Sequence, residues 1–183
     1  NVSDVQGMEI IAPYLKQWCS SYNKIESLDF SNFTNLDTIE CFLSQTLKSV
    51  NLTNTPKLAR ACFEDCDLKT LDLSGCPNLE DLRGANNAYT GINFGTTRDK
   101  VWHICVRDNL QIVEEFPSFA EFKKLRELFI WNTNQSGMLQ LATEQGCTIL
   151  ARENKYTTDD FSGCNFGDGA YIDLAYNQLD KIY

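Results

Sequence analysis

The residues of this chain best suited to chemistry are its single histidine and a nearby cysteine. His103 and Cys105 are two residues apart in the segment WHICVR. If this segment is a β-strand, both side chains point to the same face at about 6.5–7 Å, which is long for the hydrogen bond that activates a nucleophilic thiol. The sequence identifies no carboxylate that would orient the histidine. We therefore predict that the protein is not an enzyme.

The remaining cysteines and the acidic loops do not predict a metal or cofactor site. The chain has eight cysteines but no CxxC pair, and its one histidine does not complete the spacing of a zinc site. The pair Asp159–Asp160 and the GDG segment at 167–169 carry carboxylates of the kind that bind Ca²⁺, but EF-hand spacing is missing. Loop carboxylates are usually just solvated, so we predict neither a metal nor a cofactor.

Disulfide pairing is restricted by the expected positions of the cysteines. Cys62 and Cys105 fall on one strand face but are two repeats apart, roughly 10 Å at about 4.8 Å per strand. That separation exceeds the Cα–Cα distance of about 7 Å that a disulfide tolerates. Only Cys147 and Cys164, in the irregular C-terminal part, stay open as a pair. Most of the others are expected to be small buried or loop residues.

Composition and charge exclude several classes of partner. The chain has 183 residues, of which 43% are hydrophobic and 22% charged, as in an ordinary globular protein. Its formal net charge of −9 argues against binding nucleic acid or anionic membranes, because both need clustered Lys and Arg. No apolar run approaches the roughly 18 residues that span a bilayer, so we predict no membrane insertion. No signal peptide is recognisable, and because the chain starts at Asn1 we expect a further segment upstream.

The elements that position these residues are organised as a repeat. Units begin at Leu47, Leu68, Tyr89 and Leu110, each 21 residues after the previous one, and an earlier unit begins at Ile25, 22 residues before Leu47. Each unit holds two phrases of the form LxxLxL. The last two apolar residues of a phrase alternate with a polar one, which is the period of a β-strand, and a turn residue follows. Each unit is therefore predicted to be one coil of a solenoid, with two short strands, that buries its apolar edge by stacking.

The apolar positions of these phrases are the predicted core. In the first phrases they are Ile25, Leu28, Phe30, Leu47, Val50, Leu52, Leu68, Leu71, Leu73, Tyr89, Ile92 and Phe94. In the second phrases they are Leu36, Ile39, Cys41, Leu58, Ala61, Phe63, Leu79, Leu82, Gly84, Val101, Ile104, Val106, Leu125, Leu128 and Ile130.

These phrases resemble leucine-rich repeats, and the doubled form is similar to a bacterial class with the pattern LxxLxLxxNxLxxLxLxxNxx. The resemblance covers roughly residues 25–134 and implies an α/β repeat solenoid, a right-handed β/α superhelix with parallel stacks of strands. In this family an Asn or Cys after each phrase bonds backbone groups and forms a ladder between coils. These positions hold Cys66, Cys76, Asn87 and Asn109. The positions that depart from the pattern are Phe33, Thr55, Thr97 and Thr133, so we expect an incomplete ladder.

Residues 1–24 are predicted to form an N-terminal capping helix that covers the first coil. Ser3 or Asp4 could cap the start of the helix, and Pro13 predicts a kink or a later start. The apolar residues at helical spacing are Val5, Met8, Ile11, Tyr14, Leu15 and Trp18.

Residues 135–183 are predicted to form a C-terminal helix–strand part and a closing repeat. Before it, EEFPSFAEFKKL is expected to be an insertion with a short helical turn. NQSGMLQLATEQGCTILARE is typical of a helix followed by a strand, with Gly146 as a C-cap, and TTDDFSGCNFGDG is typical of a loop. The last residues return to the repeat, as a closing coil or as part of a longer array, through Ile172, Leu174, Asn177, Leu179 and Ile182.

The two outward faces of the predicted coils differ in character. The face of the first strands carries small polar residues, whereas the face of the second strands gathers aromatic and basic residues near its C-terminal end. Such residues are enriched at binding hot spots. The alternative is that Phe129 and Trp131 pack under the insertion near its phenylalanines, Phe116, Phe119 and Phe122. The candidate partner-binding residues are Trp102, His103, Arg107, Phe129 and Trp131.

The resemblance implies a non-catalytic binding scaffold, because leucine-rich repeats serve chiefly in recognition. We expect a monomeric module that is secreted or displayed at a bacterial cell surface, periplasmic or anchored at the outer membrane, with an upstream lipid anchor as one route. It would recognise a protein or glycan ligand. The alternative is a structural or spacer segment of a larger surface protein without its own ligand site. Exposed aromatic residues favour the first hypothesis, and covered aromatic residues favour the second.

Overall fold

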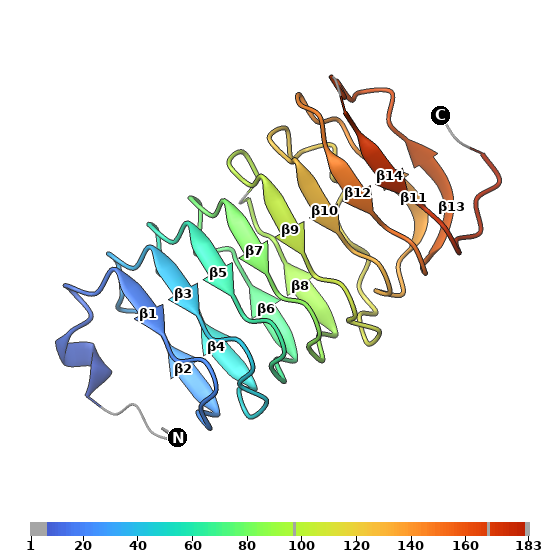
Figure 1. The fold of residues 1–183 in the computed structure, drawn as a ribbon. Helices are drawn as coiled ribbons and strands as arrows, with labels where there is room; N and C mark the ends of the chain where they lie inside the picture. The colour runs from blue at the N-terminus through green and yellow to red at the C-terminus, as the bar shows by residue number, and fades with distance from the viewer. Residues whose placement is uncertain (1–6, 97, 168, 182–183) are drawn as a thin grey trace.

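The computed structural model is a solenoid of short parallel β-strands, and it describes residues 7–96, 98–167 and 169–181. Eight strands form one continuous sheet along the molecule (Figure 1). Neighbouring strands pair in parallel, as when Asp81 pairs with Arg60 on one side and with His103 on the other. In spatial order they are β1 (Gln17–Cys19), β3 (Thr38–Glu40), β5 (Arg60–Cys62), β7 (Asp81–Arg83), β9 (His103–Cys105), β10 (Glu127–Phe129), β12 (Thr148–Leu150) and β14 (Tyr171–Asp173).

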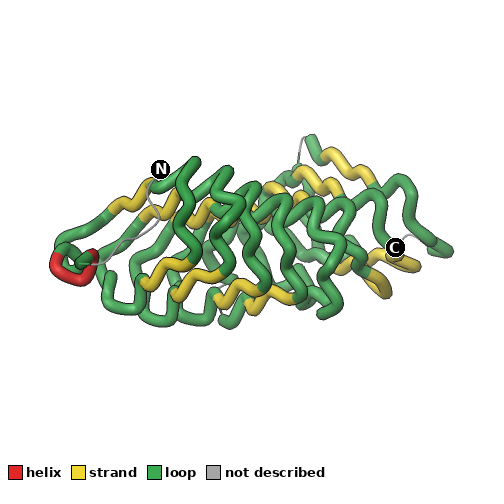
Figure 2. The backbone as a smooth tube through the Cα atoms, turned by 90° about the horizontal axis from the view of Figure 1, so that it is seen from below, coloured by secondary structure: helices red, strands yellow, loops and turns green. Residues whose placement is uncertain are grey.

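Shorter stacks of strands form the other side of the solenoid. Figure 2 shows strands on two opposite sides of the tube, joined by turns. These strands form the parallel pairs β2–β4, β6–β8 and β11–β13. Their bounds are β2 (Ser27–Asp29), β4 (Ser49–Asn51), β6 (Thr70–Asp72), β8 (Gly91–Asn93), β11 (Ser136–Gln140) and β13 (Lys155–Asp160). The prediction of at least two parallel stacks is confirmed.

The predicted core positions fill the space between the two sides. Leu71 in β6 and Leu82 in β7 are 2% and 0% exposed, and of the predicted set only Val50 is half-buried. Gly84 stands at an apolar position of its phrase because the ring of Tyr89 occupies the space beside it. A Cβ atom on Gly84 would lie 3.0 Å from the Tyr89 hydroxyl oxygen. Three-residue strands are too short to be stable alone, so burial between coils holds each one.

The N-terminal capping helix is a wrong prediction for the described residues. The chain there has one short 3₁₀ turn, η1 (Met8–Ile10), and then enters the sheet as β1. Pro13 lacks the N–H that an α-helix would need and clashes with the preceding turn, which explains why the helical spacing is not realised. Instead Ala12 is buried, and Trp18 packs its ring edge-on against Phe30 with centroids 5.9 Å apart. Ser3, Asp4 and Val5 lie outside the described residues.

The helix predicted after residue 134 is also wrong, because that segment forms strand β11. Leu139 and Leu141 are buried and Met138 is exposed, which is strand alternation rather than helical spacing. Gly137 has a φ of 76°, and the register shifts at this residue in the pairing with β13. β13 itself occupies the start of the segment predicted to be a loop.

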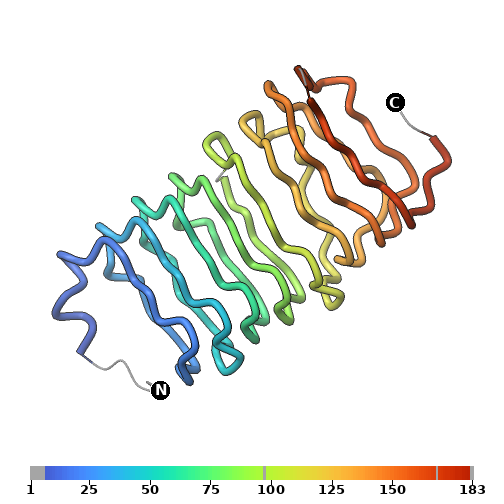
Figure 3. The backbone as a smooth tube through the Cα atoms, viewed as in Figure 1, coloured from blue at the N-terminus to red at the C-terminus, as the bar shows by residue number. Residues whose placement is uncertain are grey.

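The other C-terminal predictions are confirmed in part. The strand predicted before residue 150 is β12, and the return to the repeat is β14, which pairs with β12. Both belong to the sheet that begins at β1, so the sheet continues into the C-terminal part as far as β14. Ile182 lies outside the described residues. In Figure 3 the first and last described coils lie at opposite ends of the molecule.

The insertion before β10 has no helical turn among its described residues. Its backbone forms an isolated parallel bridge between Phe119 and Leu141. Phe116 and Phe122 both meet the ring of Phe94 edge-on, with centroids 6.1 and 5.7 Å apart. These phenylalanines fill the core of a coil that lacks a strand of its own on that side.

The α/β superhelix expected from the resemblance is therefore corrected to a solenoid of strands and turns. η1 is the only helix in the part of the chain that the structure describes. No helix in that part is long and apolar enough to cross a bilayer.

Candidate functional site

The outward face of β7, β9 and β10 carries a buried acid–histidine pair. The register places Asp81, His103 and Glu127 side by side on these strands. His103 Nδ1 lies 2.5 Å from Asp81 Oδ1, and His103 Nε2 lies 3.7 Å from Glu127 Oε2. The side chains of His103 and Asp81 are 5% and 8% exposed, although they lie on the outward positions of the strands. Both ring nitrogens of His103 therefore face carboxylates.

Two arginines complete the surroundings of Asp81. Arg83 Nε lies 3.1 and 3.2 Å from the two carboxylate oxygens, and Arg60 Nε lies 3.5 Å from Oδ2. Burial raises the pKa of Asp81, but hydrogen bonds from His103 and Arg83 outweigh it and hold the pKa below the ordinary value of 3.8. Asp81 is thus a fixed negative charge that orients the imidazole of His103.

This geometry does not support a cysteine nucleophile. Asp81 is the orienting carboxylate that the sequence did not identify, but His103 directs its nitrogens to Asp81 and Glu127. Burial, and to a lesser extent the nearby Glu64, raise the pKa of the Cys105 thiol to about 11. A thiol with such a pKa is protonated near neutral pH and is a weak nucleophile.

The acidic loop and the open cysteine pair do not form a site either. Asp159 is fully buried in β13, and Asp160 accepts hydrogen bonds from the backbone N–H and the hydroxyl of Ser162. Among the described residues, no group of three His, Cys, Asp or Glu side chains is arranged to hold a metal ion. Cys147 and Cys164 are both free thiols. Asp168, in the GDG segment, lies outside the described residues.

Four of the candidate binding residues form a row of rings that we call the aromatic ridge: Trp102, His103, Phe129 and Trp131. The ring centroids of Trp102 and His103 are 5.5 Å apart, and those of His103 and Phe129 are 5.6 Å apart. Phe129 and Trp131 follow at 6.1 Å. His103 is buried, whereas the other three side chains are half-buried and partly open to solvent. The ridge thus runs over β9 and β10 from their N-terminal ends, at Trp102, to their C-terminal ends, at Trp131.

The Trp131 end of the ridge is flanked by two arginines, Arg107, which is the fifth candidate, and Arg152. The Cζ atoms of Arg107 and Arg152 lie 5.1 and 5.6 Å from the centroid of the Trp131 ring. These three residues stand two positions beyond the ends of β9, β10 and β12, so the stacking of the coils brings them together. Cation–π contacts of this kind are worth about 0.5–1 kcal/mol at exposed sites and hold an indole in a fixed orientation.

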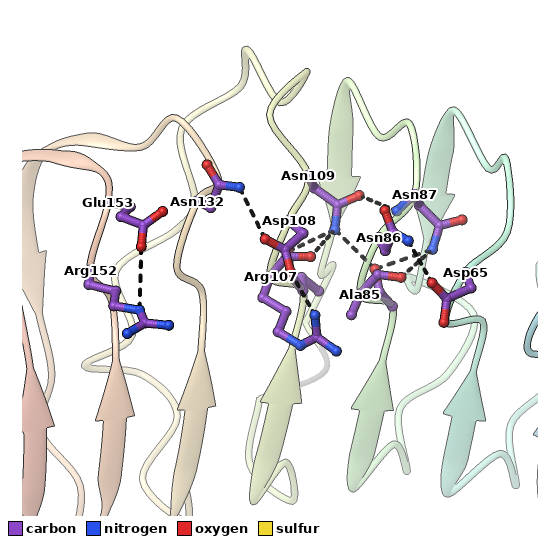
Figure 4. A network of polar contacts seen from close by, with 12 residues as sticks. Asp65, Ala85, Asn86, Asn87, Arg107, Asp108, Asn109, Asn132, Arg152 and Glu153 are labelled. Atoms are coloured by element: carbon purple, nitrogen blue, oxygen red, sulfur yellow. Dashed lines mark hydrogen bonds and ion pairs between the residues drawn. The ribbon is translucent and has the colours of Figure 1, made fainter. Parts of the chain in front are cut away.

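The turns that follow β5, β7, β9 and β10 are held together by a ladder of polar side chains (Figure 4). Asn109 is fully buried; its amide donates to the carbonyl oxygens of Val106 and Gly84 at 2.7 and 3.0 Å, and its Oδ1 accepts from Asn87 N–H at 3.0 Å. In the turn of the next coil, Asn132 donates to Asp108 Oδ1 at 3.0 Å. Arg107 is fixed in turn by Asp108, whose Oδ2 lies 2.6 Å from its Nη1.

The ladder is more complete than the sequence predicted. Thr133, expected to interrupt it, donates its hydroxyl to Ile130 O at 2.7 Å, and Thr55 donates to Leu52 O at 3.0 Å. Asn154 and Asn177 extend the ladder into the C-terminal coils. Phe33 is buried in the core instead, and Thr97 lies outside the described residues.

The alternative packing for the aromatic residues is not observed. Phe129 and Trp131 contact His103 and each other, whereas the phenylalanines of the insertion pack around Phe94. The sequence missed Arg152 and Asp81 as parts of this region. Their positions follow from the repeat, because Arg152 is 21 residues after Trp131 and Asp81 is 22 before His103.

The comparisons with known proteins add little to this geometry. No protein-family model matches the chain, and no curated protein matches it. A leucine-rich repeat protein of Leptospira interrogans is among the solved structures that are similar to it, at 13% sequence identity and with a TM-score of 0.39. The similarity covers 87% of this chain and 60% of that protein's chain, so this chain spans less than two thirds of that structure.

Proposed function

We propose that the protein is a non-catalytic binding module that recognises a protein partner with the aromatic ridge and its flanking arginines. The observation that carries the proposal is the indole of Trp131, half-exposed and held between Arg107 and Arg152. Tryptophan and arginine are the residues most enriched at hot spots, where a rigid ring costs little conformational entropy on binding. A solenoid face of this kind presents such residues on a fixed framework.

The surroundings of the ridge favour recognition over a purely structural role. A spacer segment would be expected to cover its aromatic residues, whereas Trp102, Phe129 and Trp131 stay partly open. The carboxylates beside the arginines, Asp108 and Glu153, leave the region balanced in charge. A partner surface with apolar and mixed polar groups fits this pattern better than a strongly charged one.

The experiment begins with a photo-reactive benzoylphenylalanine in place of the exposed Leu110, in the turn that follows β9, which identifies the partner by cross-linking and keeps the ridge intact. The purified partner is then titrated by calorimetry into the wild-type protein and into Trp131→Ala. We expect Trp131→Ala to weaken binding by more than about tenfold, because truncation of a hot-spot residue costs at least about 2 kcal/mol.

The control is Thr70→Ala, which removes an exposed side chain from β6 on the opposite side of the solenoid. This variant should bind within about twofold of the wild type, and both variants should keep the wild-type circular dichroism spectrum. A partner lost with Thr70→Ala and retained by Trp131→Ala would place the site on the other face and refute the proposal.

We also propose that the protein acts outside the cell and that it is a monomer. Cell fractionation followed by immunoblotting tests the location, and light scattering of the purified protein tests the monomer. Protein found in the cytoplasmic fraction would contradict the proposed location, and a stable dimer would contradict the proposed monomeric state.

A further inference from the structure

The Trp102 end of the aromatic ridge borders a pocket. Trp131, at the other end of the ridge, does not line this pocket. The pocket has a volume of about 560 Å³, within the range of about 300–1,000 Å³ typical of small-molecule sites. The pocket lies at the N-terminal ends of β7, β9, β10 and β12, where the backbone N–H of Trp102 bonds Glu80 O and that of Arg126 bonds Trp102 O. One aromatic side chain and six polar ones line it: Trp102, Glu80, Lys100, Lys124, Arg126, Glu127 and Gln145.

The lysines of this edge follow a pattern that breaks at the pocket. Amides and lysines alternate three residues before the strands: Asn35 before β3, Lys57 before β5, Asn78 before β7 and Lys100 before β9. Lys57 donates to Asn35 Oδ1 at 2.6 Å, and Lys100 donates to Asn78 Oδ1 at 2.5 Å. Each ammonium group is thus satisfied by an amide of the preceding coil. Lys124 occupies the next position, and the coil before it offers Lys100 instead of an amide.

Among the described residues, the ammonium group of Lys124 therefore lacks the amide acceptor that Lys57 and Lys100 have. It has no hydrogen-bond or ion-pair partner in the described part of the chain, and the amide oxygen of Gln145 in the following coil accepts from Arg126 Nε at 2.7 Å instead. Lys100, Lys124 and Arg126 thus bring three positive charges to the lining of the pocket, against the two carboxylates of Glu80 and Glu127, in a chain with a net charge of −9. An anionic group of a ligand would supply the missing acceptor.

The rest of the lining indicates what else the ligand carries. The half-buried indole of Trp102 offers an apolar surface and, elsewhere on its edge, a donor N–H. Glu80 and Glu127 are acceptors that would repel a second carboxylate but accept hydrogen bonds from hydroxyl groups. An acidic sugar combines all three features: an apolar ring face, several hydroxyl groups and a single carboxylate.

We propose that this pocket binds the carboxylate-bearing sugar residue of a glycan. The pyranose ring packs on Trp102, the carboxylate accepts from Lys124 and Arg126, and the hydroxyl groups donate to Glu80 and Glu127. The site shares Trp102 with the aromatic ridge, but Trp131, Arg107 and Arg152 do not line it, so its ligand binding can be tested apart from the role proposed for Trp131.

The experiment is a titration of ¹⁵N-labelled protein, followed by NMR, with methyl β-D-glucuronide and with methyl β-D-glucoside. The two probes differ only in the carboxylate. We expect saturable shifts of the Trp102 indole signal, assigned with Trp102→Phe, and binding of the glucuronide at least about tenfold tighter than of the glucoside. Lys124→Gln should weaken glucuronide binding roughly tenfold to a hundredfold, the loss for one charge-assisted hydrogen bond.

The matched control is Lys57→Gln, at the same position of an earlier coil and outside the pocket, which should bind the glucuronide as the wild type does. Equal affinity for both sugars, unchanged binding by Lys124→Gln or no saturable shift would overturn the proposal. So would equally tight binding of N-acetylglutamate amide, because the pocket would then recognise a protein carboxylate. Trp131→Ala should leave glucuronide binding intact, so failure of this proposal and failure of the protein-binding proposal are separate results.

Discussion

His103 and Asp81 lie on outward positions of their strands and yet are almost completely buried. Arg60, Arg83 and Phe129 project from the same face and contact them, so the sheet carries a small polar core on its outer side. An ion pair of this kind costs desolvation free energy and is stable only because several hydrogen bonds satisfy it. It fixes the imidazole, and the imidazole supports the rings of Trp102 and Phe129.

The first prediction concerns Asp81→Asn, which removes the charge and keeps the size of the side chain. We expect the free energy of unfolding at pH 7 to fall by about 1.5–3 kcal/mol, because hydrogen bonds to a charged group are lost. The pKa of Asp81 is lower in the folded protein than its ordinary 3.8, so its stabilising contribution is present above that value and disappears as the pH falls through the folded-state pKa. The difference between variant and wild type should therefore shrink below about pH 3.8.

Urea unfolding at pH 7 and pH 3 measures this difference. Asp99→Asn, an exposed carboxylate beyond the strands, is the control and should leave the unfolding curve unchanged at both pH values. A loss of the same size at pH 3 and pH 7 for Asp81→Asn would show that the charge is not the cause.

The strands and turns of each coil are held together by side chains that bond backbone groups of neighbouring coils. Asn109 bridges from its own turn to Gly84 O and to Asn87, so it links two coils through one buried amide. The non-glycine residues with positive φ in the same turns include Asp65, Asn86, Asp108 and Asn132. Asn and Asp tolerate this conformation better than other side chains do, which explains their repeated use there.

The second prediction tests this ladder with Asn109→Ala. The substitution leaves the buried carbonyl oxygens of Gly84 and Val106 without this donor, and we expect a loss of about 1–3 kcal/mol in the free energy of unfolding. Thermal and urea unfolding measure the loss. Asn165→Ala, in an exposed loop of the C-terminal part, should change the stability by less than about 0.5 kcal/mol. Equal effects of the two variants would contradict the role of the ladder.

How far the elements could be predicted depended on whether the repeat specified them. The strands at Leu71, Leu82 and Ile104 were predictable because a period of 21 to 22 residues places each apolar residue beside its equivalent. The N-terminal helix failed because Pro13 was expected only to kink the helix or delay its start, whereas the described chain forms a single 3₁₀ turn before Pro13 and a strand after it. The segment of β11 failed because a short apolar run fits helix and strand alike, and its pairing with β13 decided the outcome.

The candidate site was predictable as a face but not as a set of contacts. The repeat aligned Trp102, His103, Phe129 and Trp131 on the second-strand side, and the structure brings them together. The burial of His103 could not be predicted, because it depends on how the long side chains of neighbouring coils lie. Asp81 and Arg152 could have been found by counting one repeat back from His103 and one forward from Trp131.

The whole molecule is a row of coils in which each contacts mainly its neighbours, so position along the row determines what a surface can present. The small polar residues on β2, β4 and β6 offer no large side chain for anchoring. The aromatic ridge and the pocket both lie around β9 and β10, where the insertion lengthens one coil. Recognition is therefore expected from one side and one region of the solenoid.

The central claim is that the partner binds at the aromatic ridge and its flanking arginines. Hydrogen–deuterium exchange of the non-covalent complex with the purified partner, once cross-linking has identified it, tests this claim most directly. The account predicts slowed exchange in the turns that follow β9, β10 and β12, at residues 106–109, 130–133 and 151–154, with unchanged exchange at residues 72–75 on the opposite side. Protection confined to the β2, β4, β6 and β8 side, with the three turns unaffected, would contradict it.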